Sequence, residues 1–343
     1  MDPNTQTVSI TPITRDSEGG PLRRLLQFQA TPVAIATALL FVIAAIFVPK
    51  SLTPASLVAT LVPAGITAVA AIGQTLVIQQ KGIDLSVGGI MTFAAVASGM
   101  MNASGIPFWL SLIVVAIASA VIGLINGLLV TRLHITPLIA TLASNSLFIG
   151  IVWTVSKGQA NLAPDTLRAF ASGSFLGVPY IAWLTIALVI LIALVMSKSL
   201  FGRRFTAVGA NPEAAAAGGI NVSGYILSSY IIAGVFAGFA GLLLAGYAGQ
   251  TNYDLGVSYM LPVIAAVVIG GASLAGGRGS VIATAFGCLL LSLVVQVVLT
   301  LGAPTSMQLL VQSLVLAIAA AIRLIPWERL RKENATPSAV LTA

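Results

Sequence analysis

The chain has 343 residues, of which 58% are hydrophobic and only 7% are charged, whereas a soluble domain has about a quarter of its residues charged. A water-facing exterior cannot be built from this composition, so the sequence predicts an integral membrane protein. Its apolar runs are long and continuous, while the strands of a barrel alternate over about ten residues. We therefore expect an all-α polytopic membrane protein.

The composition also excludes several kinds of function. A single cysteine, Cys288, and a single histidine, His134, provide neither a disulfide framework nor a cysteine or histidine metal site. We expect no catalytic residues and no bound metal. The net charge is +7, but the cations are dispersed between apolar runs instead of gathered on one face, so we expect no nucleic-acid partner.

The order of polar and apolar stretches predicts three regions. Residues 1–32 are polar and resemble a cytosolic tail more than a cleavable signal peptide. Residues 33–325 form the membrane domain, and residues 326–343 form a second cytosolic tail. At about 20 residues for each crossing, the membrane domain accommodates ten helices. The predicted spans are 33–48, 55–80, 83–101, 107–131, 136–156, 179–197, 224–249, 259–272, 279–301 and 307–324.

The distribution of positive charge gives the orientation. If both termini are cytosolic, all but three of the 16 lysines and arginines lie on the inner side, and the exceptions are Lys50, Lys157 and Arg168. Cytoplasmic segments of membrane proteins are enriched in these residues. Losing one span would invert every later segment, so the asymmetry supports both the even number of spans and the orientation.

Two of the predicted spans contain or adjoin glycine-rich motifs. The residues that we assign to these structural motifs are Gly82, Asp84, Ser86 and Gly88 in the first segment and Gly270, Gly271, Gly276 and Gly277 in the second. Such segments predict broken or re-entrant helices whose unwound backbone lines a cavity. Five spans in each half would make an internal repeat an inverted one. For Asp84 we favour a local role, capping the following helix through Ser86, over a proton relay.

The longest inner loop, residues 198–223, contains the pattern of a short helix. Asn211 suits the N-cap, Pro212 suits the first helical position, and Glu213 complements the positive helix end. Four alanines follow, and a pair of glycines ends the pattern. A helix of about two turns is marginal in water, so we expect it to pack against its own protein or in a partner's groove.

Three stretches carry a resemblance to a known family. Gly82-Ile83-Asp84-Leu85-Ser86-Val87-Gly88, Gly209 to Ile220, and Ala266 to Gly277 resemble signatures of the ribose-type permeases (ribose, xylose and galactoside-like) of bacterial ATP-binding-cassette sugar importers. The similarity covers nearly the whole of residues 33–325. Many family members carry an acidic residue before the third motif, where this chain has Ser258 to Ala265. The resemblance therefore does not identify the sugar, pentose or hexose.

The resemblance implies a multi-pass protein of the bacterial inner membrane that works with partners. They are a second permease subunit, of the same or a related chain, an external sugar-binding protein, and a cytosolic ATPase that uses ATP and magnesium. The loop 198–223 matches the family's coupling helix. The residues that we assign to ATPase coupling are Gly209, Asn211, Pro212, Glu213, Ala214, Ala215, Gly218, Gly219 and Ile220. None of the five lysines follows a glycine, so the chain has no P-loop and we expect it to bind no cofactor itself.

Amides within or beside the apolar spans suggest a substrate route. They are Gln74, Asn126, Asn145, Gln250, Gln296 and Gln312. Neutral amides suit a sugar, which offers hydroxyl groups and no charge. We assign Gln74, Asn126, Asn145 and Gln250 to a candidate pathway. The alternative is hydrogen bonding between packed helices, which Asn126 favours because it lies between Gly123 and Gly127.

The segment 157–178 is the largest predicted outer surface. With Asp254, its charged residues Lys157, Asp165 and Arg168 form a candidate docking surface for the binding protein through charge pairing. The alternative is that these are ordinary solvated loop charges.

A different class of function is an ion-coupled secondary transporter of a small polar solute. Such a protein would need intramembrane ionisable residues, and within the spans Asp84 stands apart in being acidic.

Overall fold

The computed structural model describes residues 30–324, which lie almost entirely between the two predicted tails. Among these residues, six helices are long and apolar enough to cross a membrane. They are α3 (Pro54–Gln79), α5 (Phe108–Thr131), α6 (Pro137–Ser156), α8 (Tyr180–Lys198), α11 (Val222–Ala248) and α13 (Val281–Thr300). The prediction of a helical, polytopic membrane protein is thus confirmed.

Four further apolar helical stretches are shorter. They are α2 (Thr31–Phe47), α4 (Val87–Ala103), η2 (Val257–Tyr259) continuing into α12 (Met260–Ile269), and the Ser306–Val315 part of α14 (Thr305–Leu324). Each of the ten predicted spans coincides with one of these helical stretches. That all ten cross the membrane stays a prediction, because length and composition alone do not establish a crossing.

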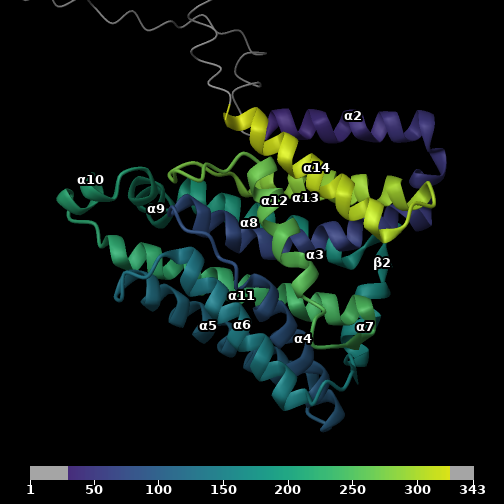
Figure 1. Ribbon diagram of the computed structural model, residues 1–343, viewed down its shortest axis with the longest axis horizontal. Coiled ribbons are helices and arrows are strands. Elements are labelled where there is room, and N and C mark those ends of the chain that lie inside the picture. Colours follow the sequence, from purple (N-terminus) through teal and green to yellow (C-terminus); the bar gives the residue numbers. More distant parts are fainter. Residues whose placement is uncertain (1–29, 325–343) are drawn as a thin grey trace, which may run out of the picture.

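The connections contain elements that the sequence did not suggest. They are η1 (Pro49–Leu52), α7 (Asp165–Ser172) and α9 (Leu200–Ala210), the last capped by the Ser199 side chain. The short helix predicted in the inner loop is α10 (Pro212–Ala217). Two antiparallel pairs of two-residue strands join loops: β1 (Asn161–Leu162) with β4 (Gln250–Thr251), and β2 (Ser174–Phe175) with β3 (Val178–Pro179). Figure 1 shows α10 and α7 at opposite ends of the bundle.

The core is built around α3 and α11. Every residue of α3 from Ala64 to Gln79 is buried, and α11 packs against α3, α4 and α5. Small residues permit this close packing: a Cβ atom on Gly73 of α3 would lie 2.5 Å from the Ala233 Cα of α11. By contrast, α5 and α8 expose large apolar side chains such as Ile117 and Leu194. Such a surface suits contact with lipid.

Both glycine-rich stretches are non-helical and connect separate helices, α3 to α4 and α12 to α13. Residues 80–86 are not helical, so α4 begins at Val87, later than the predicted start of its span. The second interruption begins at Gly270, which caps the ten-residue α12, and extends to Ser280 before α13.

Candidate substrate cavity and coupling loop

Buried side chains hold the first broken segment, residues 83–89, in place. Asp84 Oδ1 accepts hydrogen bonds from the Ser86 N–H at 2.8 Å and from Ser86 Oγ at 2.5 Å. Thr141 Oγ1 accepts the Leu85 N–H at 2.9 Å, and its one proton is within reach of the Pro137 carbonyl at 2.8 Å and the Ile83 carbonyl at 3.2 Å. Backbone outside a helix needs such partners where water is excluded. Asp84 thus makes a local turn with Ser86, the residue before α4, and the Ser86 side chain does not itself cap the helix.

Three of the candidate pathway amides serve this same segment. Gln74 pairs with the Asp84 backbone, donating to its carbonyl at 3.1 Å and accepting from its N–H at 3.2 Å. Asn126 Nδ2 donates to Ser86 Oγ at 2.8 Å, and Asn145 Oδ1 accepts the Gly89 N–H at 2.7 Å. All three side chains are buried. They stabilise the broken segment and do not line the cavity described next.

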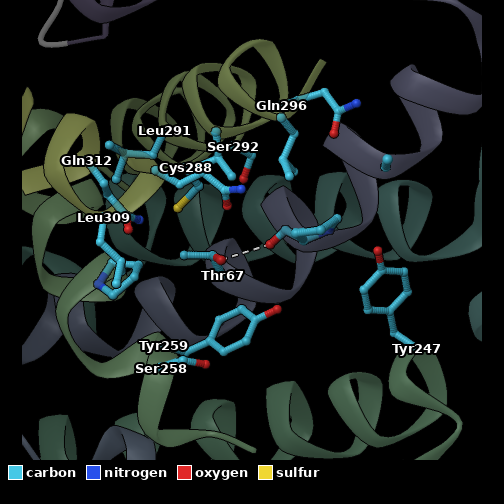
Figure 2. A pocket seen from close by; sticks show the side chains of 16 residues that line it. Thr67, Tyr247, Ser258, Tyr259, Cys288, Leu291, Ser292, Gln296, Leu309 and Gln312 are labelled. Atoms are coloured by element: carbon cyan, nitrogen blue, oxygen red, sulfur yellow. Dashed lines mark hydrogen bonds between the residues drawn. The ribbon is translucent and has the colours of Figure 1, made fainter. Parts of the chain in front are cut away.

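A cavity of about 440 Å³ lies between α3, the end of α11, η2, α12, α13 and α14. Figure 2 shows the side chains of Thr67, Tyr259, Ser292, Gln296 and Gln312 gathered around it. None of the described residues that line the cavity is charged. The volume is in the range of small-molecule sites, and the hydroxyl and amide groups set into a mostly apolar wall suit a neutral polar solute.

The position of the cavity follows from the helix ends that form it. Ala59 belongs to the start of α3, Tyr247 to the end of α11, and Leu299 to the last turn of α13, while Gln308 belongs to the first turn of α14. The loop that contains α10 lies at the opposite ends of α11 and α3, because it precedes the first residue of α11 and its Gly209 packs against Gln79 at the end of α3. The cavity therefore lies in the half of the bundle remote from α10.

Sequence patterns alone do not reveal most of the cavity. They mark Gln296 and Gln312 only as polar residues within spans, and they do not single out Tyr259, Ser292 or Gln308 as pathway residues. One feature of the sequence could have indicated part of the cavity wall. Gln308 and Gln312 are four residues apart, which puts both amides on one face of α14, and Gln296 is on the helix before it.

The loop 198–223, our candidate for ATPase coupling, has the predicted local structure. The Asn211 side chain accepts the Ala214 N–H, Pro212 occupies the first turn, and Gly218 caps the end. Ala215 is buried, whereas Glu213 and the other three alanines of α10 are exposed. The exposed face of α10 thus carries methyl groups and one carboxylate.

The coupling motif and the third motif meet at the end of α3. Gly209 packs so closely on the Gln79 carbonyl that a Cβ atom would lie 2.1 Å from it. Gly277 donates its N–H to the same carbonyl at 2.9 Å. A Cβ atom on Gly276 would lie 2.7 Å from the Gly209 carbonyl. Segments far apart in the sequence therefore form one junction.

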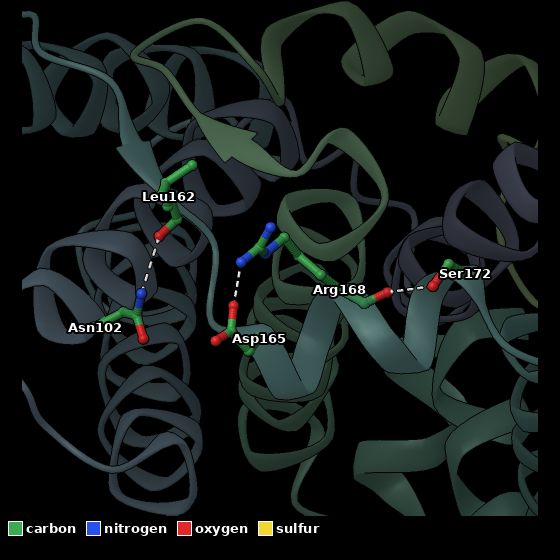
Figure 3. A network of polar contacts seen from close by, with 5 residues as sticks. All are labelled: Asn102, Leu162, Asp165, Arg168 and Ser172. Atoms are coloured by element: carbon green, nitrogen blue, oxygen red, sulfur yellow. Dashed lines mark hydrogen bonds and ion pairs between the residues drawn. The ribbon is translucent and has the colours of Figure 1, made fainter.

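The predicted docking residues lie at the end of the bundle that carries α7. Arg168 and Asp165 form an ion pair on α7, and the nearby Asn102 Nδ2 donates to the Leu162 carbonyl at 3.3 Å (Figure 3). Pairing of β1 with β4 joins the loop after Lys157 to the loop before Asp254. Lys157, Asp254 and Gln250, which is in β4, are all exposed.

The comparisons with known proteins agree with the motifs. The profile of the family described as "Branched-chain amino acid transport system / permease component" matches residues 56–320. The ribose import permease protein of Bacillus subtilis is 35% identical over 284 residues, covering 82% of this chain and 88% of that protein. The galactose/methyl galactoside import permease protein of Escherichia coli is 31% identical over 302 residues, covering 82% and 90%.

A third relative, the L-arabinose ABC transporter permease protein of Azospirillum brasilense, is 30% identical over 281 residues, covering 82% of this chain and 83% of that protein. No solved structure matches the chain. The resemblance to sugar permeases of ATP-binding-cassette importers is thus confirmed. The chain therefore belongs to the permease family whose description is "Branched-chain amino acid transport system / permease component".

Proposed function

We propose that this chain is the permease subunit of an ATP-driven, binding-protein-dependent importer that carries a pentose or hexose across the bacterial inner membrane by alternating access. The observation that carries the proposal is the uncharged cavity lined by Tyr259, Ser292, Gln296 and Gln312. Its amide and hydroxyl groups match the hydroxyl groups of a sugar. The named substrates of the three relatives, ribose, galactose and arabinose, support the same class.

In this proposal a separate subunit hydrolyses ATP. The exposed face of α10, with Glu213, Ala214 and Ala216, is small enough to enter a groove of a cytosolic ATPase that uses ATP and magnesium. A second permease subunit completes the pathway, and an external sugar-binding protein docks near α7 and Asp254. Both termini are cytosolic, and lipid surrounds the apolar outer helices.

We also propose ten crossings arranged as two inverted halves, α2–α6 and α8–α14. In the first half α3 packs against α12 and α13 of the second, and in the second half α11 packs against α4 and α5 of the first. Asp84-Leu85-Ser86-Val87 leads into α4, and Asp254-Leu255-Gly256-Val257 leads into η2 and α12. The first helix of each half departs from this symmetry, because α2 packs against α13 whereas α8 packs against α3.

The test is reconstitution in proteoliposomes with the ATPase and the binding protein, followed by uptake of labelled ribose, galactose and arabinose. We expect uptake of at least one of the three sugars, and that uptake to require ATP. The alternative is an ion-coupled secondary transporter of a small polar solute. Uptake driven by an ion gradient in the absence of the ATPase subunit would establish that alternative and overturn the proposal.

A paired substitution tests the coupling assignment separately. Glu213→Arg combined with Ala216→Trp changes the exposed face of α10 and leaves the buried Ala215 in place. We expect ATP-dependent uptake to be lost while the permease remains folded. The matched control is Ile117→Trp, a bulky substitution on the exposed face of α5, which should retain uptake. Normal uptake by the α10 variant would remove the assignment.

A further inference from the structure

Two consecutive glutamines, Gln79 and Gln80, lie where α3 meets α9. Their side chains are only 5% and 7% exposed, although glutamine usually lies at a protein's surface. Gln80 Nε2 donates to the Phe205 carbonyl of α9 at 2.8 Å. Gln79 Nε2 donates to the Gly279 carbonyl at 2.7 Å. One end of α3 therefore holds α9 with one amide and the loop before α13 with the other.

The main chain of Gln79 strengthens this junction. Its carbonyl accepts the Gly277 N–H, and Gly209 of α9 packs directly against it. We call Gln79 and Gln80, with their contacts to Phe205, Gly277 and Gly279, the inner clamp. Phe205 is fully buried and packs against Phe201 with ring centroids 5.5 Å apart. The clamp thus joins α9 through its buried side rather than through its exposed surface.

A second contact joins α3 to α13 beyond the clamp. Thr75 Oγ1 and Thr284 Oγ1 are 2.9 Å apart and hydrogen-bonded, and both side chains are buried. The same two helices form walls of the cavity farther along, through Thr67 of α3 and Ser292 of α13. A continuous path of contacts therefore runs from α9 through the clamp to the cavity.

We propose that Gln79 and Gln80 are positioning residues that make α3 and α13 follow the movement of α9 and α10, so that displacement of the coupling loop changes the shape of the cavity. The inference rests on the proposed function, because it takes α10 as the contact with the ATPase. Amides suit this task, since each donates a directed hydrogen bond to a buried carbonyl without bringing a charge. Removing either amide loosens the joint between α9 and the helices that line the cavity.

The experiment uses the complete importer in proteoliposomes, with ATP hydrolysis and uptake of the transported sugar measured on the same preparation. Gln79→Met and Gln80→Met preserve side-chain length and remove the donors. We expect the number of sugar molecules imported per ATP hydrolysed to fall about fivefold in each single variant and further in the double variant. ATP hydrolysis continues, because the exposed face of α10 is unchanged.

The matched control is Thr131→Val at the end of α5. Its hydroxyl donates to the Gly127 carbonyl of its own helix, so the substitution removes a hydrogen bond without loosening a joint between helices. We expect its ratio of import to hydrolysis to equal that of the wild type. A drop in this control as large as in the clamp variants would overturn the inference.

The ratio of import to hydrolysis distinguishes a positioning role from a merely structural one. If this ratio stays normal in the clamp variants, whether both rates are unchanged or both fall in proportion, the clamp does not transmit movement. Should the methionine variants fail to assemble, Gln79→Asn and Gln80→Asn keep the amide on a shorter side chain, and a normal ratio in these variants would equally refute the inference. A wild-type chain that imports no sugar with its ATPase refutes the proposed function instead.

Discussion

Two stretches of similar sequence have opposite surroundings in the two halves of the molecule. Asp84-Leu85-Ser86-Val87 ends in the first residue of α4, and Asp254-Leu255-Gly256-Val257 leads into η2 and α12. Asp84 is 2% exposed and hydrogen-bonded to Ser86, whereas Asp254 is exposed. At the position equivalent to Ser86 stands Gly256, where a Cβ atom would lie 2.6 Å from the Gly88 carbonyl.

This difference indicates that the two segments have different roles. The first segment is covered by Gln74, Asn126 and Asn145, so its polar groups are used within the fold. The second segment leaves Tyr259 and its neighbours beside a cavity. We infer that the first segment belongs to a rigid frame and the second to the substrate route. Substitutions in the two regions should therefore fail in different ways.

The largest loss of stability is expected where two helices of the rigid frame, α11 and α4, pack most closely. A Cβ atom on Gly241 of α11 would lie 2.3 Å from the Met91 carbonyl and 2.8 Å from its Cα, both in the backbone of α4. We expect Gly241→Leu to destabilise the protein by at least about 3 kcal/mol, because a neighbouring helix must move. Thermal unfolding of the purified protein measures this loss.

Gly150 of α6 provides the matched control, because no heavy atom lies within 4 Å of a Cβ atom placed there. Gly150→Leu should not destabilise the protein, because a helical glycine in open space gains up to about 1 kcal/mol when it is replaced by a good helix former. Equal losses at the two glycines would show that the packing of α4 on α11 is not the rigid part of the molecule.

Substitution of two amides, Asn126 beside the first segment and Gln312 in the cavity wall, compares the two regions next. Asn126→Leu removes the donor to Ser86 Oγ in a fully buried position and should cost about 1–3 kcal/mol of stability, seen as a lower unfolding temperature. Gln312→Leu alters the cavity wall, so the unfolding temperature should hold while the apparent KM for the sugar rises about fivefold. If Asn126→Leu instead impairs uptake at normal stability, Asn126 belongs to the pathway, as the sequence alternatively suggests.

The sequence could predict the helices because charge-free runs and turn residues fix where apolar helices begin and end. It also predicted α10, because Asn211, Pro212 and Gly218 act within a few residues of one another. The sequence could not predict which amides hold the first segment in place and which line the cavity. Gln74 and Gln296 are both amides within apolar helices, and their roles depend on which helices pack beside them. For the same reason the sequence does not reveal the roles of Gln79 and Gln80, since their partners are more than 100 residues away.

A smaller effect distinguishes the two aspartates directly. Asp84→Asn keeps the shape of the side chain but replaces the carboxyl group by an amide, which changes the two hydrogen bonds that Oδ1 accepts from Ser86. We expect a loss of about 1 kcal/mol of stability. Asp254→Asn, in an exposed loop, should change stability by less than about 0.5 kcal/mol. Thermal unfolding of both variants under identical conditions tests this, and an equal response would mean that burial does not separate the two segments.

The smallest effect on stability is expected at the end of the bundle that carries α7. Arg168 pairs there with Asp165, and the two side chains are 43% and 88% exposed. Such a pair contributes about 0–1 kcal/mol to stability, so Arg168→Gln should leave the unfolding temperature nearly unchanged. If α7 belongs to the docking surface, the rate constant for association with the binding protein should nevertheless change, because exposed charges act on encounter more than on the fold.

Salt provides the internal control for that measurement. Raising the ionic strength from 0.1 M to 1 M shortens the screening length from about 10 Å to about 3 Å. The association rates of wild type and Arg168→Gln should therefore differ at low salt and converge at high salt. A difference that persists at high salt would indicate that Arg168 acts on docking through the shape of its side chain and not through its charge. Identical rates at both salt concentrations would leave Arg168 as a solvated loop charge, and the docking surface would then have to lie elsewhere.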